Sequence, residues 1–202
     1  MYSKVDICNL ALSQLGDKST VENIDSPTKQ TEKVLAKWYD ISRRAALKTM
    51  MPNFAITRDL WALSAETPAF GYKYAYVYRS DCLKILGIGE ADNPSTDYSI
   101  ENGYVLTNIL YKDGLPVRYV KDEQAITKFN DSFILLFSLL LARNIAPEIT
   151  ESMTIISNLE KNIPIKTMEI MALEAQENKP IIIKSSKLLT ARRGLKVGVS
   201  KK

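Results

Sequence analysis

The most apolar stretch of the chain runs from Phe133 to Ala142 and is interrupted only by Ser138. The helix that this stretch predicts is apolar on every side, and such a helix is stable only when other elements surround it. Even when it is extended to Ile145, the stretch is shorter than the roughly 20 residues that a membrane span needs. The sequence therefore predicts a buried helix at the centre of the fold and no membrane span.

A first helix is predicted near the N-terminus. Ser3 and Asp6 have the spacing of a capping box, and Gly16 is a typical residue at a helix end. Between them, apolar residues recur at helical spacing. The predicted buried stripe is Ile7, Cys8, Ala11, Leu12 and Leu15.

A second, longer helix is predicted to begin with Ser26 as its cap and Pro27 at its first position, and to stop at Pro52. One of its faces repeats apolar residues at spacings of 4, 3 and 4: Val34, Trp38, Ile41 and Ala45. Arg43 and Arg44 flank this stripe, so we expect them to be either solvated or paired with an acid.

The central helix is predicted to extend over about 123–145, with Pro147 ending it. A last helix then begins with Thr150 as its cap. Pro164 lies inside this last helix, so we expect a kink or a break there. Pro180 closes the helical region.

The middle of the chain is predicted to be β-rich. Aromatic residues occupy every second position of one segment and would lie on one side of a strand: Phe70, Tyr72, Tyr74, Tyr76 and Tyr78. The favoured interpretation is a ladder that covers helices and fills a core. The alternative is a platform on which nucleic-acid bases stack.

Further strands are predicted at 82–88, 98–101, 104–108 and 117–121. Asn102-Gly103 is a strong hairpin signal between two of them, and Asp113-Gly114 predicts a second turn. Pro116 is typical of an edge strand. The predicted fold is therefore α+β and mainly helical. It consists of a bundle of about four helices, with a β-rich insertion at about 68–121 between the second and third helices.

The charges divide the chain at its C-terminal end. Residues 179–202 contain eight Lys or Arg and no acid, whereas the rest of the chain contains 19 basic and 23 acidic residues. An acidic body over residues 1–178 therefore carries an extended, basic C-terminal arm over residues 179–202.

Residues that support catalysis are scarce. The chain has no histidine and shows no Gly-rich phosphate loop, nucleophile elbow or zinc-ligand spacing. Cys8 and Cys82 lie in apolar surroundings and are predicted to be core residues of a protein in a reducing compartment. We therefore expect no enzyme activity, no cofactor and no metal.

Four short segments carry a family likeness: Ile7 to Gly16, Tyr39 to Leu47, Asn53-Phe54-Ala55, and Pro68 to Tyr76 leading into Ser80 to Leu86. In this order they resemble the tail tubular protein A family. These proteins are the head-to-tail adaptors of short-tailed bacteriophages, also called packaged-DNA stabilisation proteins. Pro52 stands where the family often has Trp.

The resemblance implies a subunit of a closed, dodecameric homo-oligomeric ring at the head–tail junction of the virion, made in the host cytoplasm. Such a ring would extend the DNA channel below the portal and retain packaged DNA. Double-stranded DNA would pass without sequence-specific binding, and the ring would receive the next tail or nozzle protein. An acidic body fits a conduit that weakly repels phosphate.

The resemblance also implies that the C-terminal arm reaches the portal protein. The candidate portal-docking residues are Ile181, Ile182, Lys184, Lys187, Leu188, Arg192, Arg193 and Lys196. The candidates for packing within the fold or between subunits are Trp38, Arg43, Phe70, Tyr74, Tyr76 and Cys82.

The alternative hypothesis is a nucleic-acid-binding protein whose basic arm contacts phosphates. Against it, no predicted helix of the body is basic, and the arm interleaves its cations with apolar rather than aromatic residues. A third interpretation of the arm is a disordered, solubilising end. Whether the portal or DNA orders the arm would discriminate between these hypotheses.

Overall fold

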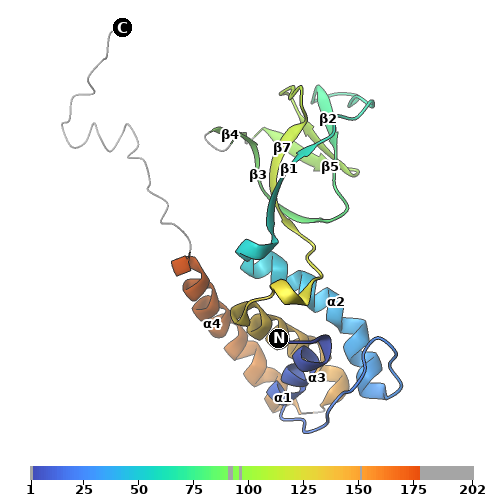
Figure 1. Ribbon diagram of the computed structural model, residues 1–202, viewed down its shortest axis with the longest axis vertical. Helices are drawn as coiled ribbons and strands as arrows, with labels where there is room; N and C mark the ends of the chain where they lie inside the picture. Colours follow the sequence, from blue (N-terminus) through green and yellow to red (C-terminus); the bar gives the residue numbers. More distant parts are fainter. Residues whose placement is uncertain (1, 91–92, 96, 151, 178–202) are drawn as a thin grey trace, which may run out of the picture.

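Helices and strands occupy opposite ends of the molecule in the computed structural model (Figure 1), which describes residues 2–90, 93–95, 97–150 and 152–177. The helices, which we call the helical part, are α1 (Lys4–Gln14), α2 (Gln30–Met50), α3 (Asp131–Ile149) and α4 (Met153–Glu177). The strands of the described residues all lie between α2 and α3 in the chain, and we call residues 56–121 the β part. The fold is therefore mixed α+β.

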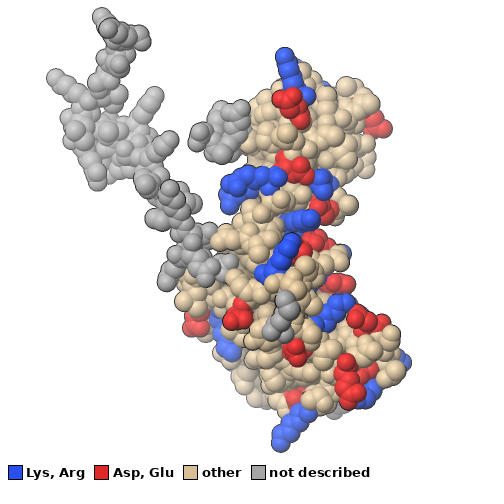
Figure 2. All heavy atoms as spheres, in the orientation of Figure 1, with Lys and Arg blue, Asp and Glu red and all other residues tan. Residues whose placement is uncertain are grey.

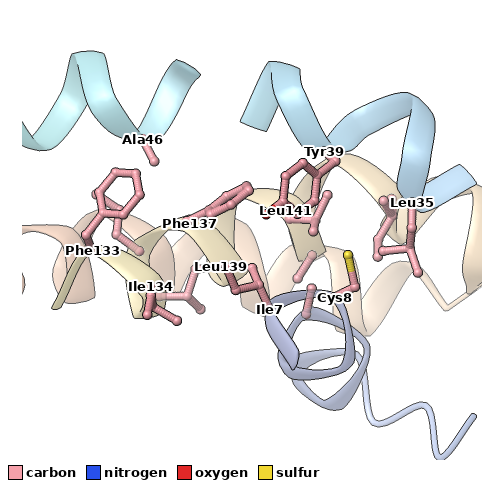
Figure 3. Packing of buried hydrophobic residues seen from close by; sticks show 14 of the residues in the cluster. Ile7, Cys8, Leu35, Tyr39, Ala46, Phe133, Ile134, Phe137, Leu139 and Leu141 are labelled. Carbon is pink, nitrogen blue, oxygen red and sulfur yellow. The ribbon is translucent and has the colours of Figure 1, made fainter. Parts of the chain in front are cut away.

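α3 is the central helix, as the apolar stretch predicts. It packs against α1, α2 and α4, and Figure 3 shows side chains of α1 and α2 in contact with it. By length and composition α3 alone among the described helices could cross a membrane, but most of it is buried inside this protein. Its apolar residues are therefore explained by the core, where Phe133, Phe137 and Leu141 are fully buried.

The bounds of α3 differ from the prediction. The helix begins at Asp131, because the side chain of Asn130 accepts a hydrogen bond of 2.9 Å from the Phe133 amide. The preceding residues form only a short 3-10 helix, η2 (Ile126–Lys128). Pro147 lies within the last turn of α3 rather than ending it. In the last turn of a helix the missing proline N–H removes a single hydrogen bond, which α3 tolerates.

The N-terminal helix follows the prediction closely. The Asp6 amide donates to Ser3 Oγ at 3.2 Å, and the Ser3 amide donates to Asp6 Oδ2 at 2.8 Å, which completes the capping box. After the helix, Gly16 has a φ of +72°. Every residue of the predicted stripe is buried.

α2 begins later than predicted and buries a different face. The carboxylate of Glu32 accepts hydrogen bonds from the amides of Thr28 and Lys29 at 2.8 and 3.0 Å, so the helix begins at Gln30 instead of Pro27. Of the predicted stripe, Val34 is buried, Trp38 and Ala45 are half-buried and Ile41 is exposed. The buried face is Val34, Leu35, Tyr39, Ser42, Arg43, Ala46, Leu47 and Met50, together with Glu32.

α4 runs through Pro164 as one element, so the predicted break does not occur. Thr150 lies before the helix, and its hydroxyl accepts a hydrogen bond from the Ser152 amide at 3.2 Å. The first backbone hydrogen bonds of α4 go to the carbonyl of Ser152. Ser152 therefore takes the capping position that the sequence assigns to Thr150.

The strands form two antiparallel sheets. The first sheet has the order β1-β7-β3-β4 and the second the order β2-β6-β5. The strands are β1 (Ile56–Trp61), β2 (Tyr74–Val77), β3 (Cys82–Glu90), β4 (Asn93–Ser95), β5 (Tyr98–Glu101), β6 (Tyr104–Thr107) and β7 (Leu115–Lys121). The backbone after β1 pairs with β2, since the amide of Ser64 donates to the carbonyl of Ala75 at 2.8 Å, and this links the sheets.

The predicted hairpin is present, with Asn102 and Gly103 both at positive φ between β5 and β6. The β region, however, begins at Ile56 rather than at about residue 68. β1 precedes the predicted insertion and is an additional strand. β7 is an internal strand and not an edge. Pro116 is accommodated because the pairing of β7 with β3 ends at Val117, one residue away.

The two parts meet at a buried ion pair. Arg43 of α2 is only 2% exposed, and its Nη1 donates at 2.6 Å both to Asp122 Oδ1 and to the carbonyl of Glu123. Arg44 donates from Nε to the other oxygen of Asp122 at 3.0 Å. The Asp122 amide in turn donates to the carbonyl of Asp81 beside β3, at 2.8 Å. Both arginines are thus paired with an acid, and Asp122 joins α2 to the β part.

These two arginines provide a matched test, because both contact Asp122 but only Arg43 is buried. We expect Arg43→Met to lower the free energy of unfolding by about 3 kcal/mol, since it removes the buried partner of a carboxylate. Arg44→Met should cost less than about 1 kcal/mol, as is typical of an exposed ion pair. Urea unfolding of both variants measures the difference. Equal costs would show that the buried pair does not hold the parts together.

Candidate assembly surfaces

The predicted portal-docking residues, Ile181 to Lys196, lie outside the described residues, so their role stays a prediction. The structure does describe the helix that leads toward them. α4 is 25 residues long and ends at Glu177, four positions before Ile181 in the sequence.

α4 packs on the rest of the protein along one face. Leu159, Ile163 and Ile170 are buried in the core cluster that α4 shares with α3. Successive buried residues are four and seven positions apart, so they form one stripe on the helix. α4 is therefore attached to its own chain along a single stripe.

The opposite face of α4 is apolar in its C-terminal half. Ile165 and Met168 are 58% and 73% exposed. By the period of 3.6 residues they lie across the helix from the buried stripe, and we call them the outer α4 face. Met153 and Leu173, at 74% and 59% exposure, lie nearer the edges of the buried stripe. Exposed apolar residues grouped in this way are typical of an interaction surface.

Four of the predicted packing residues belong to the β part, and three of them lie in its core. Tyr76 is fully buried, and its hydroxyl accepts a hydrogen bond of 2.9 Å from the Tyr111 amide. Cys82 is buried and Tyr74 is half-buried in the same cluster. This cluster lies between the sheets, with Trp61 and Tyr119 in edge-on contact at 5.4 Å between ring centroids. The aromatic side chains thus pack between sheets and not on helices, and a buried Tyr76 rules out a stacking platform that includes this ring.

Phe70 does not pack within the fold as predicted. β2 begins only at Tyr74, and Phe70 precedes it in a bend with its side chain 89% exposed. Gly71 beside it has a φ of +83°, which breaks the extended conformation that alternation requires. The proposal that Phe70 contacts another subunit is unaffected by this position.

Trp38 links α2 to the end of α3. Its Nε1 donates to Glu148 Oε1 at 2.8 Å, and Lys37 Nζ lies 3.0 Å from the same oxygen. The Trp38 hydrogen bond, followed by that of Lys37, lowers the pKa of Glu148. Arg43, the other predicted packing residue of α2, forms the buried ion pair described above. Both residues thus hold elements of the fold together.

The described residues show no group of His, Cys, Asp and Glu that could hold a metal ion. Burial raises the pKa of the Cys8 thiol to about 12, so at neutral pH it is not the reactive thiolate. Burial is also the main cause that raises the pKa of Cys82. Neither cysteine is therefore placed to act as a nucleophile.

Comparison with protein-family models finds no match for this chain, and comparison with curated protein sequences finds none either. A functional assignment therefore depends on the chain's own residues. These are the segments that resemble phage adaptors, the outer α4 face and the separation of charge between body and arm.

The aromatic residues give a test of core packing against base stacking. Tyr76→Ala should lower the free energy of unfolding by about 3–5 kcal/mol, because it empties a buried aromatic site. Phe70→Ala should change it by no more than about 0.5 kcal/mol, because that ring is exposed. Urea unfolding measures both, and Phe70→Ala is the matched control. An unchanged unfolding curve for Tyr76→Ala would contradict the packing described here.

Proposed function

We propose that this chain is a structural virion protein, a subunit of the ring that connects the portal to the tail of a short-tailed bacteriophage. In this proposal α1–α4 are the helical bundle of the adaptor body, and the β part is its insertion. Residues 179–202 are the arm that docks on the portal. The ring is a closed dodecamer that extends the DNA channel, retains the packaged DNA and receives the next tail protein. The protein is then located at the head–tail junction and has no enzyme activity.

The observation that carries the proposal is the outer α4 face. A closed ring needs two different surfaces on each subunit, each contacting a neighbour. α4 offers an apolar surface directed away from its own chain, and it leads directly into the basic segment. A helix used only as a cover for α3 would be expected to be polar along this whole side, as α4 is at Ser157 and Lys161 but not at Ile165 and Met168. The outer α4 face therefore favours a protein that assembles.

The positions of the family-like segments give further support. The first forms α1, the second lies in α2 and includes Arg43, and the third is the short 3-10 helix η1 (Asn53–Ala55). Phe54 of η1 packs against Phe129 and Phe133 at centroid distances of 5.6 and 5.2 Å, where the β part joins the helices. Two of the four segments, those with Arg43 and Phe54, thus fall where the two parts are joined, which supports a shared architecture.

The alternative remains a nucleic-acid-binding protein that uses its basic arm, since eight Lys or Arg lie in residues 179–202. On the face shown in Figure 2, however, basic and acidic side chains of the body are interspersed and form no continuous basic track. Proteins that follow a nucleic-acid backbone need such a track. This face of the body therefore favours the adaptor over the nucleic-acid-binding protein.

The proposal is tested by mixing the protein with the portal ring encoded by the same phage genome and imaging the product by electron microscopy. We expect a ring of this protein on one end of the portal. The double variant Ile165→Glu/Met168→Glu should leave thermal unfolding nearly unchanged, because both side chains are exposed, but should reduce ring formation. Ile41→Glu, at an exposed apolar residue of α2, is the matched control.

Two results would count against these statements. If the unmodified protein does not join the portal at micromolar concentration, the adaptor proposal is wrong. If the α4 variant and the Ile41 control form rings equally well, the outer α4 face is not a subunit contact.

The arm is tested separately by Arg192→Glu/Arg193→Glu. We expect the unfolding of the body to be unchanged and portal binding to weaken by about 2–5 kcal/mol, since arginine can bind carboxylate with two hydrogen bonds. Lys201→Glu/Lys202→Glu makes the same charge change at the chain end and is the control. Binding to portal and to duplex DNA is measured across a salt series. A modest loss with a shallower salt slope for DNA would instead support the nucleic-acid alternative.

A further inference from the structure

Two arginines lie side by side on the outer face of the first sheet. Arg58 of β1 and Arg118 of β7 are direct cross-strand partners, and both are exposed. Trp61 and Tyr119 on the same strands belong to the core between the sheets. Because side chains alternate along a strand, the two arginines point away from that core. Directly opposed residues of antiparallel strands have Cβ atoms about 5 Å apart, so the two cations start from adjacent positions.

Neither arginine has an ion-pair or hydrogen-bond partner within the part of the chain that the structure describes. The nearest acid in sequence, Asp59, is already bound by Arg79, with 2.7 Å between Asp59 Oδ2 and Arg79 Nη1. Like charges directly opposite each other destabilise a sheet. The fold therefore gains nothing from this pair, and residues that cost stability commonly serve a function.

The arginines line a groove with a volume of about 580 Å³. Leu60, Leu86 and Pro116 are apolar residues of its lining. Asp59 also lines it, but its carboxylate is paired with Arg79. Gly87 is the cross-strand neighbour of Arg118 on the side away from β1. A Cβ atom at Gly87 would meet nothing within 4 Å, so the groove is open above this residue. The groove thus combines an apolar floor with a pair of free cations.

We propose that this groove binds an extended, acidic segment of a protein partner, in which carboxylate and apolar side chains alternate. The guanidinium groups would each bind a carboxylate with paired hydrogen bonds. The apolar side chains of the segment would lie against the floor that Gly87 leaves open. The inference depends on the geometry of the first sheet and is independent of the proposed adaptor function.

The charge of the groove argues against two other occupants. The chain's own residues 179–202 contain eight Lys or Arg and no acid, so the arginines would repel them. A nucleic-acid backbone needs several cations along a track, whereas this groove offers two cations above an apolar floor. Carboxylates of a protein partner match both features.

A short synthetic peptide in which Glu and Val alternate is the probe. It is titrated into the full-length ¹⁵N-labelled protein, and NMR follows the backbone amides and the arginine Nε–Hε signals. We expect shifts in β1, β3 and β7 and in the signals of Arg58 and Arg118. Arg58→Ala/Arg118→Ala should weaken binding at least about tenfold. The melting temperature of this variant should stay the same or rise, because a like-charge contact is removed.

Two further variants separate charge from shape. Gly87→Leu keeps both arginines but fills the groove, and it should also weaken binding; its melting temperature shows that the sheet is intact. Arg143→Ala removes an exposed arginine of α3 that has no ion pair within the described residues, and it should leave binding unchanged. The proposal is overturned if the peptide causes no shifts at millimolar concentration, or if a Gln-Val peptide binds equally well. It is also overturned if duplex DNA, or a second copy of the protein, occupies the groove in place of the peptide.

Discussion

The buried guanidinium of Arg43 determines how the two halves of this protein are joined. A charge removed from water is tolerated only when it is paired and hydrogen-bonded. Besides Asp40 on α2 itself, Arg43 binds Asp122 and the carbonyl of Glu123, both in the segment that leaves β7. Because the backbone of Asp122 is also bound to Asp81, the position of α2 is coupled to the start of β3 through one residue. An apolar contact could slide by a fraction of a residue without losing much energy. A charged pair of this kind fixes the position and the angle together.

The parts of the fold that could be predicted are those whose pattern admits one solution. A helix that is apolar on every side, such as α3, must be central, and Asn102-Gly103 supplies the two positive φ angles of a tight hairpin. The buried face of α2 could not be predicted, because two neighbouring stripes have the same 4-3-4 spacing. The sequence favours the stripe with Ile41, since the correct one includes Ser42 and Arg43. Those polar residues become core residues only through Asn144 and Asp122, which lie far away in the chain.

The same limit applies to the candidate surfaces. Composition identifies the basic arm, but the outer α4 face is visible only once the buried stripe is known, because α4 carries apolar residues all round. The pairing of Arg58 with Arg118 depends on the register between two strands distant in sequence. Period-2 alternation from Phe70 to Tyr78 predicts one continuous strand, yet Gly71 interrupts it. Alternation describes the face on which side chains would lie, and it does not show where the strand begins.

The position of α3 in the chain has a consequence for the order of folding. α1 and α2 leave the ribosome first, but the helix that they pack against follows the entire β part. Until α3 is synthesised, the apolar faces of α1 and α2 have no permanent partner, and their exposure favours aggregation. The core then closes through contacts between residues far apart in sequence, which form slowly. Synthesis of this chain therefore places its greatest demand on chaperones in the interval before α3 emerges.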